Sequence, residues 1–290
     1  MRPDVAPFLH ADSNTWSYVA SDPSTRIAAI IDPVLDFDAK SGRTGTASAL
    51  ALLDHVRAHD LQVCWLLETH AHADHLSAAC WLKQQLPEAT LAIGAGIRAV
   101  QATFRPIFNA DFAIDGSQFG SLFDDGETFA FGDMPARVIA VPGHTPDSIA
   151  YLIGDALFTG DSLFLPDGGS ARCDFPGGDA VMLYRSIQRL FSQLPDQTRV
   201  FICHDYGPGG RELKCETTLG EQKRSNIHVR DGIDEGTFVA TRSARDATLP
   251  IPALLLPALQ VNLRAGALPA PEDNGVRYLK IPLNQLQERL

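Results

Sequence analysis

The stretch Thr69-His70-Ala71-His72-Ala73-Asp74-His75 is the most informative part of this chain. It follows the apolar run Val63-Cys64-Trp65-Leu66-Leu67, which is typical of a buried strand. Three imidazoles and one carboxylate therefore stand close together at the exit of a predicted strand. These groups are ligands for zinc, iron or manganese. The stretch predicts a metal site at the edge of a sheet.

Further side chains of the ligand type follow later in the chain. Pro142-Gly143-His144-Thr145-Pro146 is a predicted turn after one strand, and Asp161 lies just past another. His204 leaves a third apolar strand. Loop residues at strand exits can converge on one point of a rigid scaffold. We therefore expect His144, Asp161 and His204 to join the first cluster in one centre.

The composition is that of an ordinary globular protein. Of the 290 residues, 45% are hydrophobic and 20% are charged, and the net charge is −11. This charge argues against duplex nucleic acid as a partner. We find neither a signal peptide nor a run long and apolar enough for a membrane helix. Five cysteines without a CxxC pair suit a reducing compartment, so we expect a cytoplasmic protein without a membrane partner.

The order of the predicted elements indicates two successive β-rich blocks, each flanked by helices. In the first block we predict strands over 16–20, 26–31, 63–67 and 91–93 and helices over 46–59, 75–86 and 96–108. In the second block we predict strands over 128–131, 137–141, 148–153, 156–159 and 199–203 and a helix over 179–194. The fold class is α/β (α+β), as a four-layer αββα sandwich with the ligands on one rim of the sheets.

The last part of the chain differs from the rest. We predict a catalytic domain over residues 1–245 and a C-terminal extension over residues 246–290. The proline-rich run from Leu249 to Pro257 breaks the helical period, and its apolar residues require burial. We expect the extension to pack on its own domain. The alternative is that it covers the subunit interface of a homodimer.

The motifs, in this order, resemble those of the metallo-β-lactamase superfamily over roughly residues 15–230. Several strings are more similar to the glutathione persulfide dioxygenases, which are sulfur dioxygenases related to the ethylmalonic-encephalopathy protein. These strings are Ile31-Asp32-Pro33-Val34, 69–75, 142–146, 160–164, Ala171-Arg172-Cys173-Asp174-Phe175 and His204-Asp205-Tyr206. The segment 172–175 distinguishes this branch from the hydroxyacylglutathione hydrolases of the glyoxalase II type, which tend to have a lysine-containing segment there.

The resemblance implies one Fe(II) per chain, held by His70, His144 and Asp161. Two histidines and one carboxylate leave three coordination positions open. The implied reaction oxidises glutathione persulfide with O2 to sulfite and glutathione. Four outer groups would complete a dinuclear site in the hydrolase branches: His72, Asp74, His75 and His204. A zinc-dependent or dinuclear thioester hydrolase therefore stays open as the alternative, and a non-catalytic metal or thiol sensor is a further one.

The resemblance also suggests how glutathione would be bound. Arg172 would form a bidentate pair with a carboxylate of glutathione. Tyr206 would reach the peptide portion of the substrate through its hydroxyl group. Arg211 and Lys214 are close in sequence and are candidates for additional charge, although an ordinary solvated loop explains them equally well.

Two further roles are open at this stage. Asp74 and Asp205 are candidates for the hydrogen bonds that fix the ring nitrogens of the ligand histidines. Cys173 would be redox-sensitive if it were exposed in a positive environment, but we favour an inert small residue.

Overall fold

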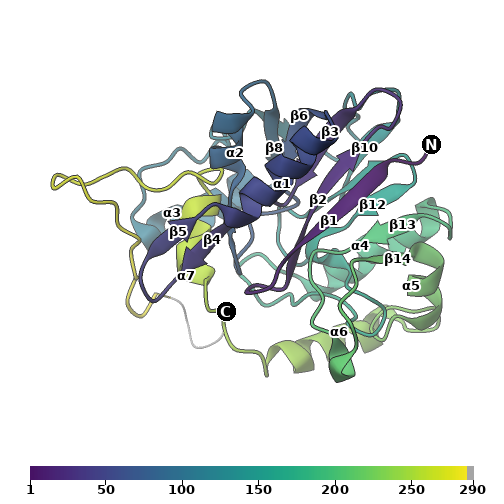
Figure 1. Cartoon of the computed structure of the whole chain (residues 1–290). Coiled ribbons are helices and arrows are strands. Elements are labelled where there is room, and N and C mark those ends of the chain that lie inside the picture. Colours follow the sequence, from purple (N-terminus) through teal and green to yellow (C-terminus); the bar gives the residue numbers. More distant parts are fainter. Residues whose placement is uncertain (286–290) are drawn as a thin grey trace.

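Two β-sheets pack face to face between two layers of helices in the computed structural model, which describes residues 1–285 (Figure 1). The first sheet has the strand order β1-β2-β3-β6-β8-β9, and the second has the order β10-β11-β12-β13-β14. The apolar residues between the sheets and those under each helical layer form three separate clusters. The predicted αββα sandwich is confirmed.

The N-terminal half of the chain forms the first sheet. Its strands are β1 (Asp4–His10), β2 (Thr15–Ser21), β3 (Ile27–Ile31), β6 (Gln62–Leu67), β8 (Thr90–Gly94) and β9 (Ser121–Phe123). β1, β2 and β3 are antiparallel, whereas β3, β6, β8 and β9 are parallel. The carboxyl ends of these parallel strands share one edge of the sheet, and the histidine-rich stretch follows β6 at that edge. A small separate sheet contains β4 (Val34–Asp38), β5 (Arg43–Gly45) and β7 (Leu76–Ser77).

The second sheet comes from the C-terminal half. Its strands are β10 (Ala136–Ala140), β11 (Ile149–Ile153), β12 (Ala156–Phe158), β13 (Arg199–Phe201) and β14 (Glu216–Thr218). Only β12 and β13 pair in parallel, and the other neighbours are antiparallel. Asp161 and His204 follow these two parallel strands, so both side chains leave the sheet at the same edge.

The helices form the two outer layers. The first layer contains α1 (Ala47–Ala58), α2 (Ala79–Gln85), α3 (Ile97–Phe108) and α7 (Leu255–Asn262). The second contains α4 (Ala180–Gln193), α5 (Leu219–Ser225) and α6 (Glu235–Asp246). The side chain of Asp179 caps α4 by accepting a hydrogen bond from the backbone N–H of Met182. In the part of the chain that the structure describes, no helix is long and apolar enough to cross a membrane.

Two predicted elements are wrong in type or length. The helix predicted over 75–86 is confined to α2, because Leu76 and Ser77 pair with β4 as the strand β7. The strand predicted over 128–131 contains only two isolated bridges, Thr128 with Arg137 and Phe131 with Met134. A tight turn after Phe131 leaves too few residues for a ladder.

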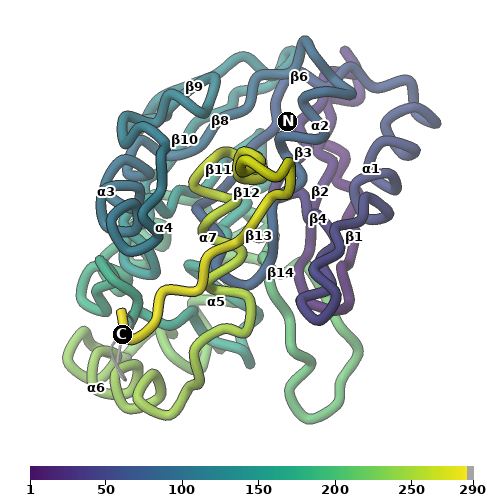
Figure 2. The backbone as a smooth tube through the Cα atoms, turned by 90° about the vertical axis from the view of Figure 1, so that its left-hand side faces the viewer, coloured from purple at the N-terminus to yellow at the C-terminus, as the bar shows by residue number. Residues whose placement is uncertain are grey.

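The C-terminal segment packs on its own chain. Leu255, Ala258, Leu259 and Val261 of α7 are buried in the same cluster as α1, α2 and α3. Beyond α7 the chain crosses next to α3 and returns to α7, where Gln260 hydrogen-bonds the backbone of Lys280 (Figure 2). The proline-rich run therefore leads into a helix that the broken sequence pattern did not indicate.

Aromatic packing between the sheets provides a test of this core. Phe158 is 1% exposed, stacks on Phe201 at 5.1 Å and meets Tyr18 edge to face at 5.4 Å. Phe158→Ala is expected to lower the free energy of unfolding by about 3–5 kcal/mol, because it removes these contacts and leaves a cavity. Urea titration of the metal-free protein measures the change. Leu50→Ala on the exposed side of α1 is the control, with an expected change within about 0.5 kcal/mol; equal losses in both variants would contradict this account.

Candidate metal centre

Asp32 at the end of β3 fixes the start of the histidine-rich stretch. Its carboxylate accepts hydrogen bonds from the Thr69 backbone N–H at 2.7 Å and from the Thr69 hydroxyl at 2.9 Å. The Thr69 Oγ1 also lies 3.1 Å from Nδ1 of His70. Since the single hydroxyl hydrogen points to Asp32, the ring nitrogen Nδ1 of His70 is the donor in this contact. Nε2 of His70 is therefore left with a free lone pair.

His144 is oriented in a similar way from the other half of the molecule. Its Nδ1 lies 2.7 Å from the backbone carbonyl oxygen of Arg172, which can only accept a hydrogen bond. Nε2 of His144 therefore faces Asp161, whose Oδ2 is 3.6 Å away. The ring also contacts Phe175 edge to face.

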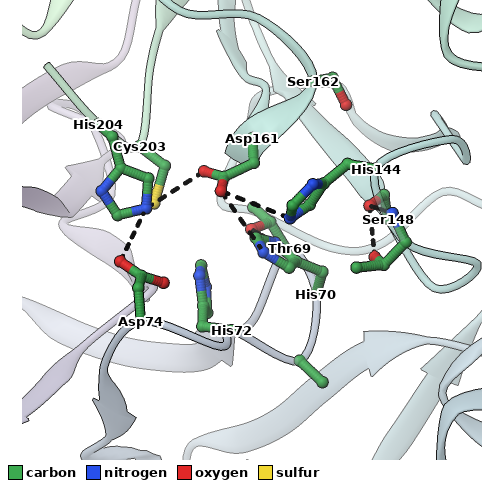
Figure 3. A network of polar contacts seen from close by, with 12 residues as sticks. Thr69, His70, His72, Asp74, His144, Ser148, Asp161, Ser162, Cys203 and His204 are labelled. Carbon is green, nitrogen blue, oxygen red and sulfur yellow. Dashed lines mark hydrogen bonds and ion pairs between the residues drawn. The ribbon is translucent and has the colours of Figure 1, made fainter. Parts of the chain in front are cut away.

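The side chains of His70, His144 and Asp161 converge at the shared edge of the two sheets (Figure 3). Their donor atoms all lie within 4.8 Å of one another, with His70 Nε2 at 3.9 Å from Asp161 Oδ2. His70 Nε2 is buried without a hydrogen-bond partner. Unpartnered buried polar atoms are costly, and a cation would satisfy them. This donor set fits a metal ion.

The protonation state of His70 also suits a ligand. Burial lowers the pKa of His70 well below its usual value, and the neighbouring imidazole of His72 adds to the effect. The ring is therefore neutral at neutral pH, and a metal need not displace a proton from it.

His72 lies outside this group of three donors. Its Nε2 is 3.0 Å from Asp32 Oδ1 and 3.8 Å from Glu68 Oε2. Burial alone would lower the pKa of His72, but the charge of Asp32 outweighs it and raises the pKa to about 10. In the metal-free protein His72 is thus a charged partner of buried carboxylates.

A second group lies on the other side of Asp161. His204 Nε2 is 3.3 Å from Asp161 Oδ1 and 3.2 Å from Asp74 Oδ2. Burial alone would lower the pKa of His204, but these two carboxylates raise it. His75 leaves its Nε2 without a partner, and its ring centroid is 6.4 Å from that of His204. Asp161 therefore faces the three-donor group with one oxygen and the second group with the other.

The hydrogen bonds to the ligand rings differ from the prediction. Asp74 and Asp205 are the candidates that the sequence offers, but the Thr69 hydroxyl and the Arg172 carbonyl make these contacts. Asp74 instead pairs with His204, and Asp205 accepts two hydrogen bonds from Arg211. Backbone carbonyl partners have no sequence signature, and the role of Thr69 depends on its contact with Asp32.

The predicted substrate residues are placed in different surroundings. The guanidinium of Arg172 forms a bidentate pair with Asp174, and it also donates to the Pro250 carbonyl at 2.7 Å. The carboxylate of Asp174 thus forms the bidentate pair with Arg172 that we predicted for a carboxylate of glutathione. Arg211 is likewise paired with Asp167 and Asp205.

The remaining two candidates are open to solvent. Tyr206 is 61% exposed and lies over the ring of His204, with ring centroids 6.1 Å apart. Lys214 is exposed on the same loop and binds Asp205 through its backbone N–H. Cys173 is buried, and burial raises the pKa of its thiol, as suits an inert residue.

Sequence reasoning missed several supporting residues. Glu68 accepts a hydrogen bond from Ser77, and burial raises the pKa of Glu68 to about 8. Asp147 accepts a hydrogen bond from the backbone N–H of Ala71 at 2.8 Å. This bond connects the loop that carries His144 to the loop that carries His70. The sequence signal for Asp32 is its position directly after the strand β3.

The family model described as the metallo-beta-lactamase superfamily matches residues 12–204. The chain belongs to this superfamily. The matched range includes all the donors described above, from His70 to His204.

Known members of the superfamily that resemble the chain have different names. A beta-lactamase hydrolase-like protein of Agrobacterium fabrum is 54% identical over 98% of this chain, which spans only 66% of that protein. Glyoxylase B2 of Dictyostelium discoideum is 46% identical, with 98% of each chain covered. The human mitochondrial persulfide dioxygenase ETHE1 is 30% identical over 88% of this chain and 85% of its own.

A solved structure gives the same picture of the fold. The crystal structure of ETHE1 from Myxococcus xanthus aligns with a TM-score of 0.73 at 32% identity. The alignment covers 91% of this chain and all of the other. Because the coverage exceeds the range 12–204, the likeness includes parts of the chain outside the family model.

The convergence of donors predicts the effect of removing one of them. His70→Ala is expected to abolish metal retention, because the carboxylate and the single remaining histidine no longer form a three-donor set. Metal content after gel filtration, measured by mass spectrometry, checks this. His59→Ala, an exposed histidine on the first helical layer, is the control and should keep the wild-type content. Full occupancy in His70→Ala would refute the ligand assignment.

Proposed function

We propose that this protein is a persulfide dioxygenase that uses one Fe(II) held by His70, His144 and Asp161. The observation that carries the proposal is the separate group of two histidines and one carboxylate, from which His72 is held apart by Asp32. Such a set leaves coordination positions for both a substrate and O2 and is typical of non-haem iron oxygenases.

The comparisons support the same choice. Relatives named persulfide dioxygenase and ETHE1 are about one third identical over most of the chain. The segment Arg172-Cys173-Asp174-Phe175, which pointed to this branch, lies directly beside the centre, where Arg172 binds the ring of His144 through its carbonyl.

The reaction balances with the substrates named. Glutathione persulfide, O2 and water give glutathione, sulfite and two protons, and the sulfur–sulfur bond is broken by hydrolysis of the oxidised terminal sulfur. Iron, when bound, supplies the electron transfer to O2 that side chains lack.

The residues of the chain position the reactants and control charge. Thr69 and the Arg172 carbonyl fix the two ring planes, so the open side of the centre has a defined direction. His204, placed between Asp74 and Asp161, holds a proton beside the carboxylate ligand. Tyr206 and Phe164 lie next to His204 and are the aromatic groups that a substrate entering there would meet.

A zinc-dependent hydrolase acting on glutathione thioesters is the second candidate. Asp161 faces His204 with its other oxygen, and His75 keeps a buried ring nitrogen without a partner. These donors would suit a second metal ion, and a metal-bound hydroxide is the usual nucleophile of such sites. The names of the relatives from Agrobacterium and Dictyostelium agree with this alternative.

Oxygen consumption distinguishes the two. Protein loaded with Fe(II) under anaerobic conditions is mixed with fresh glutathione persulfide and O2, and sulfite is measured in parallel. We expect oxygen uptake and sulfite in equal amounts, with no uptake by the zinc-loaded protein. If verified iron-loaded protein consumes no oxygen but zinc-loaded protein cleaves S-lactoylglutathione, the hydrolase is correct.

The substrate roles of Arg172, Tyr206, Arg211 and Lys214 remain part of this proposal. Arg172 uses three of its five N–H groups internally, so two remain for a carboxylate of glutathione. Arg172→Ala is expected to raise KM for glutathione persulfide at least tenfold, since a charge-assisted pair is lost. Iron content should not change, because His144 binds only the backbone carbonyl of residue 172. Arg185→Ala, which breaks an exposed pair with Glu235, is the control; an unchanged KM in Arg172→Ala removes that residue from the substrate site.

A further inference from the structure

Asn262, the last residue of α7, makes three side-chain hydrogen bonds to the metal-binding loop, residues 70–77. Its Nδ2 donates hydrogen bonds to the carbonyl oxygens of His72 and His75, both at 2.8 Å. Its Oδ1 accepts a hydrogen bond from the Ser77 backbone N–H, also at 2.8 Å. The residue is 5% exposed. One side chain therefore bridges both ends of the segment 72–77 from a position about 190 residues later in the chain.

The helix that presents Asn262 is firmly seated. The apolar residues of α7 are buried in the core of the first helical layer, and the Leu263 carbonyl accepts a hydrogen bond from the buried side chain of Gln101 at 3.0 Å. After the helix, Gly266 has a φ of +80°, and a Cβ there would lie 2.9 Å from the Ser77 carbonyl oxygen. The chain therefore passes too close to the loop for a larger residue at this point.

We propose that Asn262 is a positioning residue of the metal centre, supplied by the C-terminal extension. By fixing the carbonyl groups of His72 and His75, it sets where the side chains of the intervening segment lie relative to Asp161 and His204. The proposal rests on metal binding at this site: His72 and His75 lie beside the three donors of the dioxygenase and would be ligands themselves in a dinuclear hydrolase. Asn262 lies outside the range 12–204 of the family model, so that range does not contain every residue that shapes the centre.

An isosteric substitution tests the proposal. Asn262→Asp keeps an oxygen that can accept from Ser77 but places a second carboxylate oxygen against two carbonyl oxygens, which have no hydrogen to share. The matched control is Gln260→Glu, the same chemical change at a buried amide of the same helix. Gln260 donates to the carbonyl oxygens of Leu256 and Lys280 and does not touch the metal-binding loop.

Cobalt(II) serves as the probe, because it gives a visible spectrum that reports ligand geometry. Metal-free protein is titrated with cobalt(II) against a competing chelator, and thermal unfolding of the metal-free protein is recorded alongside. We expect about 10-fold weaker cobalt binding and an altered spectrum for Asn262→Asp, the lower end of the range for lost hydrogen bonds to ligands, because Asn262 acts through residues next to them. Gln260→Glu should keep the wild-type affinity and spectrum.

Two results would overturn the proposal. One is a wild-type cobalt affinity and spectrum in Asn262→Asp. The other is an equal loss of cobalt affinity in Asn262→Asp and Gln260→Glu, in proportion to the decrease in their unfolding temperatures. If Asn262→Asp does not fold, the neutral and smaller Asn262→Ser takes its place, with the same expectation and the same conditions for refutation. None of these readouts depends on oxygen consumption, so a failure of the dioxygenase proposal would be recognised separately.

Discussion

The contact between Asp32 and Thr69 holds the candidate metal centre together. It joins the ends of two parallel strands, β3 and β6, just where the chain leaves the sheet. The same carboxylate orients the ring of His70 through the Thr69 hydroxyl and holds the ring of His72 directly. One buried carboxylate thus contacts both neighbouring histidines, of which His70 belongs to the three-donor group with Asp161 and His72 does not. A charge so deeply buried is stable only because each oxygen has a partner.

Asp161 links the two halves of the site in a comparable way. It follows β12 of the second sheet, and its two oxygens face different sets of histidines. The first set consists of rings fixed by neutral acceptors, and the second contains His204 in an ion pair with Asp74. The asymmetry gives the two sets different chemical character. Burial lowers the pKa of His70 in the first set, whereas the carboxylates of Asp161 and Asp74 raise the pKa of His204 in the second.

The C-terminal segment belongs to the structure of the site as well as to the core. α7 closes the first helical layer, and the side chain at its end reaches the loop between His72 and Ser77. Burial of the apolar residues of α7 holds the helix in place, and the hydrogen bonds of Asn262 hold the loop between His72 and Ser77 against that helix. Packing and site geometry are therefore coupled through one hydrogen-bonded side chain.

The amino-acid sequence by itself determined the layered fold and the positions of the donors along the chain. Apolar strands followed directly by His70, Asp161 and His204 are local signals, and parallel strands bring their exits to one edge. The spacing of the residues does not distinguish His70 from His72, and the contacts with Thr69 and Asp32 that separate them exist only in the folded chain. The tertiary structure also brings Arg172 to the Pro250 carbonyl and Asn262 to the loop of residues 72–77. Side-chain direction and long-range packing depend on contacts between distant segments, which no local pattern records.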